Sequence, residues 1–148
     1  HFIKRMPSRA KASWRWVAIF AFSRQRQITA VSIPDTVDSI GQEAFYICPS
    51  LQQLKLPARL KIIGKNAFNY CRALKSVIVP TGTIHIDRHA FYDCTALKTI
   101  SIPDAVGFMG EKVFGADGDA KVECTIVCRQ DSYVEHYAKE NGILCSFV

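Results

Sequence analysis

The chain has 148 residues, 49% of them apolar, which is enough for one continuous core and too short for two ordinary domains. Its longest apolar run, WVAIFAF at 16–22, is about a third of the roughly 20 residues that a membrane helix needs, so no membrane span is predicted. The formal charge of +6 would favour nucleic acid or another anionic partner if it lay on a folded face.

The excess positive charge lies in the N-terminal segment. Residues 1–27 hold seven basic side chains and no acidic one, whereas the remaining 121 residues hold twelve basic and thirteen acidic ones, a net charge of −1. A nearly neutral body does not predict nucleic-acid binding, and we expect none. Residues 1–13 are interpreted as a basic tail, with disorder left open, and anionic-ligand binding by this arm is kept as an alternative. The segment shows no clear signal peptide.

From residue 14 on, the chain repeats itself every 23 residues. Four kinds of position keep this period independently: Pro34, Pro57, Pro80 and Pro103; Phe22, Phe45, Phe68, Phe91 and Phe114; Cys48, Cys71 and Cys94; and Ile28, Leu51, Leu74 and Leu97. Such a period indicates a solenoid, because one short unit cannot bury its apolar face and must stack on the next. We expect a degenerate first unit at 14–27, regular units at 28–114 and a C-terminal cap at 115–148.

Each unit is predicted to be a short strand followed by a compact return. Apolar residues alternate with polar ones just before the proline, which is the period of a strand with one buried face, and the proline ends the strand. The residues kept constant are expected to stack on their equivalents in the next unit, so that Phe45, Phe68 and Phe91 form an aromatic column. Glycine is expected to permit a tight bend, with Asp87 replacing it in one unit.

The C-terminal segment DSYVEHYAKENGILCSF predicts a short amphipathic helix that covers the last coil. Ser132 followed by Glu135 is a capping box, and Asn141-Gly142 is a helix stop. Asp117, which stands where other units have cysteine, marks with the loop GADGDA the place where the array leaves its register.

The repeated pattern L-x-x-L-x-L-P … I-G-x-x-A-F-x-x-C-x-x-L resembles the BspA-like leucine-rich repeats, found largely in bacterial surface proteins and in some parasitic protists. Full motifs cover residues 28–114, and residues 17–27 fit as a degenerate unit in which Ala18 replaces glycine and Gln25 replaces cysteine. The expected fold is a short α/β solenoid of about four to five coils, with one narrow, mostly parallel sheet and a helical cap. The resemblance implies a cell-surface or secreted location.

The six cysteines admit a disulfide framework, but the repeat supplies a packing reason for three of them. Cys48, Cys71 and Cys94 occupy one core column and are interpreted as reduced, structural thiols. Cys124 and Cys128 would lie about 13 Å apart along a strand, too far for a bridge, and Cys145 has no obvious partner.

Two histidines and two aspartates are candidates for chemistry. His85 and His89 have the spacing of a zinc pair on a helix, which admits a metal-dependent hydrolase, but they stand at drifting positions in a bend and are interpreted as surface residues. Asp35 and Asp104 follow the strand-ending prolines and are interpreted as turn residues. We therefore expect no catalytic residue, no metal site and no cofactor.

The outward positions of the predicted strands are the remaining candidates for binding. They are Gln53, Lys55, Ser76, Ile78, Thr99 and Ser101. The sequence and the resemblance together predict a non-enzymatic module that binds protein or glycan on host or neighbouring cells, including an adhesive role. A purely structural spacer in a larger surface protein is the alternative. We expect a monomer, or a weak dimer through the exposed strand of the N-terminal coil.

Overall fold

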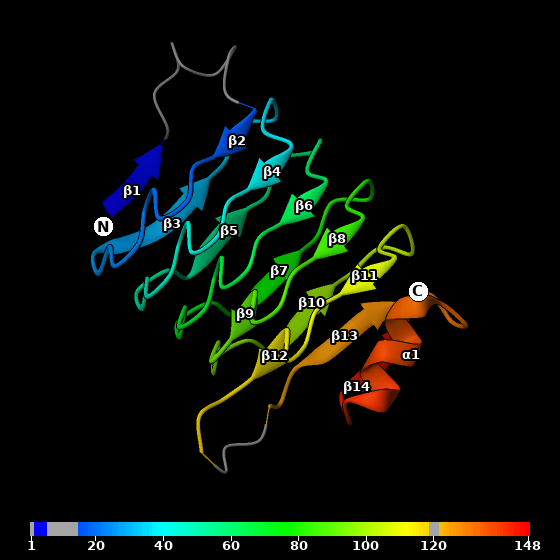
Figure 1. Cartoon of the computed structure of the whole chain (residues 1–148). Helices are drawn as coiled ribbons and strands as arrows, with labels where there is room; N and C mark the ends of the chain where they lie inside the picture. The colour runs from blue at the N-terminus through cyan, green and yellow to red at the C-terminus, as the bar shows by residue number, and fades with distance from the viewer. Residues whose placement is uncertain (1, 6–14, 119–121) are drawn as a thin grey trace.

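The computed structural model describes residues 2–5, 15–118 and 122–148, which wind into a β-solenoid of about six turns with one short helix at its C-terminal end (Figure 1). The predicted number of coils, four to five, is too low, because residues 2–5 of the N-terminal tail and the C-terminal cap also contribute strands. The α/β character is also corrected, since the only helix among the described residues is α1 (Tyr133–Glu140). The returns between strands are built from turns and further short strands.

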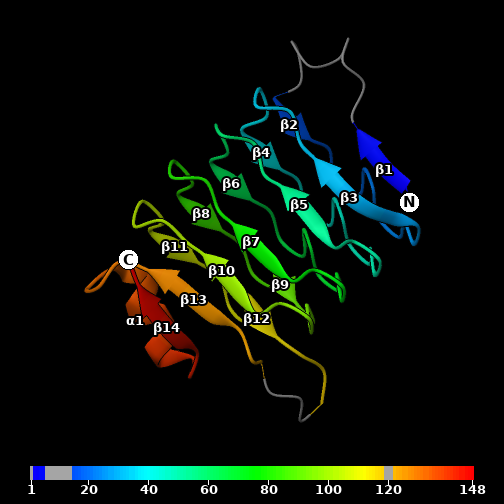
Figure 2. The same ribbon diagram turned by 180° about the vertical axis from the view of Figure 1, so that it is seen from behind.

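The strands form parallel strips along the solenoid, so that each side of the coil repeats from one turn to the next (Figure 2). The first strip contains β1 (Phe2–Arg5), β3 (Ile28–Ser32), β5 (Gln53–Lys55), β7 (Ser76–Ile78), β10 (Thr99–Ser101), β13 (Thr125–Cys128) and β14 (Leu144–Phe147). The second contains β2 (Trp16–Val17), β4 (Ser39–Ile40), β6 (Ile62–Ile63), β8 (His85–Ile86) and β11 (Phe108–Met109). A third, shorter strip pairs β9 (Phe91–Tyr92) with β12 (Phe114–Gly115).

The N-terminal strand β1 lies within the predicted basic tail and pairs in parallel with β3. Residues 6–13 of that tail lie outside the described residues. No helix in the described ranges has the length and apolarity that crossing a bilayer requires.

The phenylalanines at the 23-residue period form the centre of the core. Phe45, Phe68 and Phe91 are each at most 1% exposed, and their ring centroids lie 5.2 and 5.4 Å apart along the column. Phe22 and Phe114 extend the column at its two ends, with centroid distances of 5.2 and 6.0 Å to their neighbours. This spacing follows the separation of stacked strands, about 4.8 Å, so the same backbone ladder that joins the coils brings the rings into contact.

The cysteine column fastens each coil to the one before it. Cys71 Sγ donates a hydrogen bond to the carbonyl of Phe45 at 3.3 Å, and Cys94 repeats this contact with Phe68 at 3.1 Å. Burial raises the pKa of both thiols well above the ordinary value, so they stay protonated and keep their donor hydrogen.

The glycines of the repeat are required by close approach of neighbouring coils. A Cβ atom on Gly41 would lie 2.7 Å from the carbonyl oxygen of Val17, and one on Gly64 would lie 2.7 Å from that of Ile40. Neither glycine has a positive φ, so the turn that follows each of them does not depend on a left-handed glycine. Left-handed conformations occur instead two residues later, at the non-glycine positions Phe20, Glu43, Asn66, His89 and Lys112.

The turn that carries each phenylalanine is bonded to the next turn by three backbone N–H groups. Those of Asn66, Phe68 and Tyr70 donate to carbonyl oxygens one coil further on, at 3.1, 2.8 and 2.9 Å. The turns before and after repeat the pattern. Donors therefore point along the array toward the C-terminal end.

The predicted capping signals of α1 are confirmed. Ser132 Oγ accepts a hydrogen bond from the N–H of Glu135 at 3.2 Å, and Gly142 ends the helix with a φ of +66°. Val134 and Ala138 on the inner side of the helix are buried, which closes the last coil.

Replacing Phe68 by alanine tests the column at its centre. We expect Phe68→Ala to lower the free energy of unfolding by about 3–5 kcal/mol, because it leaves a cavity between two rings. Urea unfolding measures this loss. Phe108→Ala, at a position that is 47% exposed, is the matched control and should cost well under half as much. Equal losses for the two variants would contradict a core role for the column.

Candidate functional site

The predicted binding positions lie together on the outer face of the first strip. Strand register pairs Ser76 with Thr99 and Ile78 with Ser101, and it places Gln53 and Lys55 beside Ala30 and Ser32. Strand β5 lies next to β7, which makes the face continuous (Figure 2). We call these six predicted positions the strand face. Ile78 is 76% exposed and is its most exposed large apolar side chain.

An open depression of about 540 Å³ adjoins Lys55 at the carboxyl ends of β3 and β5. It is lined by Ser32, Ile33, Pro34, Asp35, Thr36, Lys55 and Arg59. Within the described ranges, neither Lys55 nor Arg59 belongs to an ion pair. Asp35 is held in the turn by accepting the N–H of Ala58 at 3.0 Å. The depression therefore offers two cations to a ligand.

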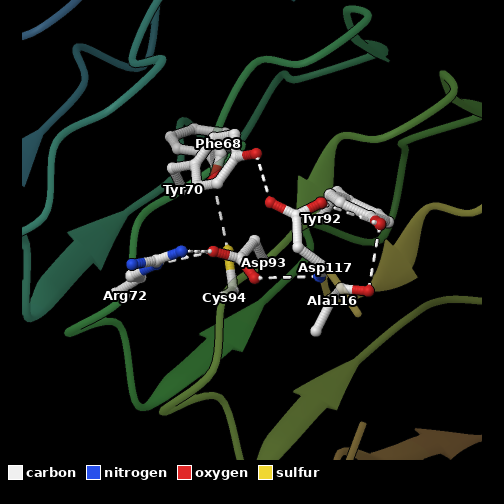
Figure 3. Close-up of polar contacts among 8 residues, drawn as sticks. All are labelled: Phe68, Tyr70, Arg72, Tyr92, Asp93, Cys94, Ala116 and Asp117. Atoms are coloured by element: carbon white, nitrogen blue, oxygen red, sulfur yellow. Dashed lines mark hydrogen bonds and ion pairs between the residues drawn. The ribbon is translucent and has the colours of Figure 1, made fainter. Parts of the chain in front are cut away.

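A polar cluster joins three coils on the turn side of the molecule (Figure 3). Tyr70 donates to Asp117 at 2.6 Å, and Tyr92 donates to the same carboxylate at 3.3 Å and to the carbonyl of Ala116 at 3.0 Å. Asp93, which is 2% exposed, is paired with Arg72 and accepts the N–H of Asp117 at 3.4 Å. These contacts anchor the point where the array leaves its register.

The carboxylate of Asp117 contributes to the raised pKa values of both tyrosines in this cluster. Its hydrogen bond is the largest cause that raises the pKa of Tyr70 to about 12, followed by desolvation. The pKa of Tyr92 is raised chiefly by burial and next by the charge of Asp117. Both phenols therefore remain neutral donors, and the cluster serves as an anchor. Sequence reasoning found Asp117 only as a break in the cysteine series; its partners lie 47 and 25 residues away, too far for a local pattern to reveal.

The two histidines lie on different parts of the coil surface. His85 stacks on Phe108 with ring centroids 4.5 Å apart and lies 3.8 Å from the carboxylate of Asp87. His89 lies against Tyr92, and burial, with Arg88 as the next cause, lowers its pKa. The residues that the structure describes contain no group of three or more metal-ligating side chains.

The candidate aspartates and the C-terminal cysteines have structural contacts. Asp104 forms an ion pair with Arg129 at 3.0 Å. Cys124, Cys128 and Cys145 are free thiols, and burial, with Cys145 as the next cause, raises the pKa of Cys128 to about 11. The parallel pairing of β13 with β14 thus provides Cys145 with the neighbour that the sequence did not suggest.

A solenoid whose strand, aromatic column and turn ladder recur every 23 residues defines a leucine-rich-repeat protein. The family described as "BspA type Leucine rich repeat region" matches residues 15–135 in six copies. The chain belongs to this family.

Solved structures of similar fold come from bacteria. A leucine rich cell surface protein from Faecalibacterium prausnitzii A2-165 is 26% identical, with a TM-score of 0.65 over 79% of this chain and 32% of that chain. A leucine-rich repeat protein from Bacteroides ovatus ATCC 8483 is also 26% identical, with a TM-score of 0.53 over 77% and 37%. The pneumococcal vaccine antigen PcpA, at 14% identity, shares the fold with a TM-score of 0.76 over 98% and 40%. The chain thus spans about a third of the length of the first two proteins. No curated protein matches it significantly.

Removing the charge of Asp117 tests the polar cluster. We expect Asp117→Asn to lower the pKa of Tyr70 from about 12 toward its ordinary value of 10.0. Since the folded state raises this pKa, the stabilisation is fully present below pH 10.0 and is lost as the pH rises through about 12. Carbon-13 NMR of the tyrosine Cζ atoms follows the titration. Asp104→Asn is the control and should leave Tyr70 unchanged; an unshifted Tyr70 in Asp117→Asn would contradict the assignment.

Proposed function

We propose that this chain is a non-enzymatic module that binds protein or glycan through its strand face, as part of a cell-surface or secreted protein. Three findings support this proposal: membership of the BspA-type repeat family, the similarity to a bacterial protein described as a cell surface protein, and the exposed, regular face itself. The partner lies on a host or neighbouring cell, and an adhesive role follows from such an encounter.

The observation that carries the proposal is the combination of Ile78 with the depression beside Lys55. An apolar side chain that is 76% exposed loses its contact with water when a partner covers it, which contributes favourably to binding. Lys55 and Arg59, without acidic partners within the described ranges, supply charge for orientation at one edge of the same face. Small polar residues around them, Ser76, Thr99 and Ser101, allow close approach of a flat ligand.

The strand face can be changed with little effect on the core. We expect the double variant Lys55→Glu/Ile78→Asp to weaken capture on an array of glycans and extracellular-matrix proteins at least tenfold, with the melting temperature nearly unchanged, because both side chains point to solvent. The matched control is Lys75→Glu/Ile62→Asp, which makes the same chemical changes at exposed positions outside the face.

Two salt concentrations separate the strand face from the basic arm. Binding through the face should persist when salt is raised, whereas binding through the arm should fall steeply. Equal binding by the double variant and its control would contradict the proposal and favour the spacer role.

A further inference from the structure

A second cleft, separate from the strand face, lies beside the last of the stacked turns that carry the phenylalanines, at the C-terminal end of the array. Its volume is about 540 Å³. It is lined by Tyr92, Lys112, Phe114, Gly115, Ala116, Val122, Asn141, Gly142 and Ile143. One wall is therefore the last turn with β12, and another is the end of α1, so the cleft lies where the repeat gives way to the cap.

The last turn of the array presents donors that every earlier turn has bonded. The N–H groups of His89, Phe91 and Asp93 donate to the following coil at 3.3, 2.9 and 2.7 Å. Their equivalents, 23 residues later, are those of Lys112, Phe114 and Ala116. Lys112 keeps the left-handed backbone of His89, with φ values of 48° and 58°. Ala116 does not keep the left-handed backbone of Asp93, whose φ is 54°. Lys112, Phe114 and Ala116 all line the cleft.

Two tyrosine hydroxyls of the cap accept N–H groups that lie next to these donors in the sequence. The hydroxyl of Tyr133 accepts the N–H of Met109 at 3.0 Å, and that of Tyr137 accepts the N–H of Val113 at 3.1 Å. For the N–H groups of Lys112, Phe114 and Ala116, the described part of the chain supplies no hydrogen-bond acceptor. The chain positions that would carry the next carbonyls belong to α1. The cleft thus has the donor row of an unpaired strand edge.

We propose that the cleft binds an extended, acidic segment of another polypeptide, which adds a strand to the last turn. Alternate backbone carbonyls of the segment accept hydrogen bonds from the N–H groups of Lys112, Phe114 and Ala116, as the carbonyls of a following coil do elsewhere in the array. In an extended segment, the carbonyls that point to one side recur about 6.6 Å apart, at every second residue. Recognition by addition of a strand supplies affinity through main-chain bonds and specificity through the flanking side chains.

The lining of the cleft sets the charge and size of the segment. Among the described residues that line the cleft, Lys112 is the only charged one, so the complementary segment carries a carboxylate beside it. Phe114, Val122 and Ile143 offer apolar surface to the neighbouring side chains. A second copy of this chain would have to seat a whole coil, and the end of α1 already stands across the cleft, so a single extended strand is the better fit.

Hydrogen exchange of the free protein tests the donor row directly. We expect the amide hydrogens of Lys112, Phe114 and Ala116 to exchange at least a hundredfold faster than those of the equivalent residues in the preceding turn. Only the amides of the preceding turn have hydrogen-bond acceptors. NMR-detected exchange on the full chain resolves both sets. Equally slow exchange of the two sets would show that the donors are already satisfied and would overturn the proposal.

Binding is tested with a defined probe, the fluorescein-labelled peptide Thr-Val-Asp-Val-Asp-Val-Thr. We expect saturable binding by fluorescence anisotropy, slower exchange of the three amides, and at least tenfold weaker binding of the peptide in which asparagine replaces both aspartates. Val122→Trp, which fills the cleft without removing a donor, and Lys112→Glu should each weaken binding at least tenfold. Lys75→Glu is the charge-matched control.

Besides equally slow exchange, three results would overturn the proposal: no saturable binding of the peptide, binding that Val122→Trp leaves unchanged, or self-association in sedimentation that Val122→Trp abolishes while no peptide binds. The variants of the strand face are expected to bind this peptide normally. The two sites can therefore fail independently.

Discussion

The hydrogen-bond ladder between successive coils is the constraint on which the rest of the structure depends. Because each turn donates three N–H groups to the next, every coil must repeat the backbone of its neighbour at a separation of about 5 Å. This repetition brings phenylalanine rings to 5.2–5.4 Å within the column and leaves no room for a Cβ at Gly41 or Gly64. The 23-residue period in the sequence therefore follows from the need of successive coils to form the same backbone hydrogen bonds.

Much of the fold could be predicted because stacking places residues that are 23 positions apart in equivalent environments. The strand positions, the parallel arrangement and the cap helix follow from the period, the alternation of apolar residues and the signals at Ser132 and Gly142. The left-handed turn positions could not be predicted, since Glu43, Asn66 and His89 share no side-chain property. There the stacked neighbours impose the conformation, and local preference does not reveal it.

The candidate sites differ in the same way. Alternation along the strands is enough to assign Lys55 and Ile78 to the outer face, because side chains in a strand point to opposite sides in turn. The depression beside Lys55 also needs Arg59 from the return, and the anchor at Asp117 needs tyrosines from two earlier coils. Both features bring together residues from different coils or returns. The sequence of a single repeat unit does not reveal such contacts.

A repeating ladder also determines where the molecule remains open to partners. Inside the array each coil accepts the three alternate N–H donors of the turn before it, so these donors are not open to a partner. The outward side chains of the strands remain exposed, because stacking of the coils does not bury them. The last turn differs for another reason: the cap contributes tyrosine hydroxyls to Met109 and Val113, whereas its described residues supply no carbonyl to the N–H groups of Lys112, Phe114 and Ala116. The proposed strand-face site and the proposed site at the end of the array thus both follow from one stacking rule, the first through side chains and the second through main-chain donors.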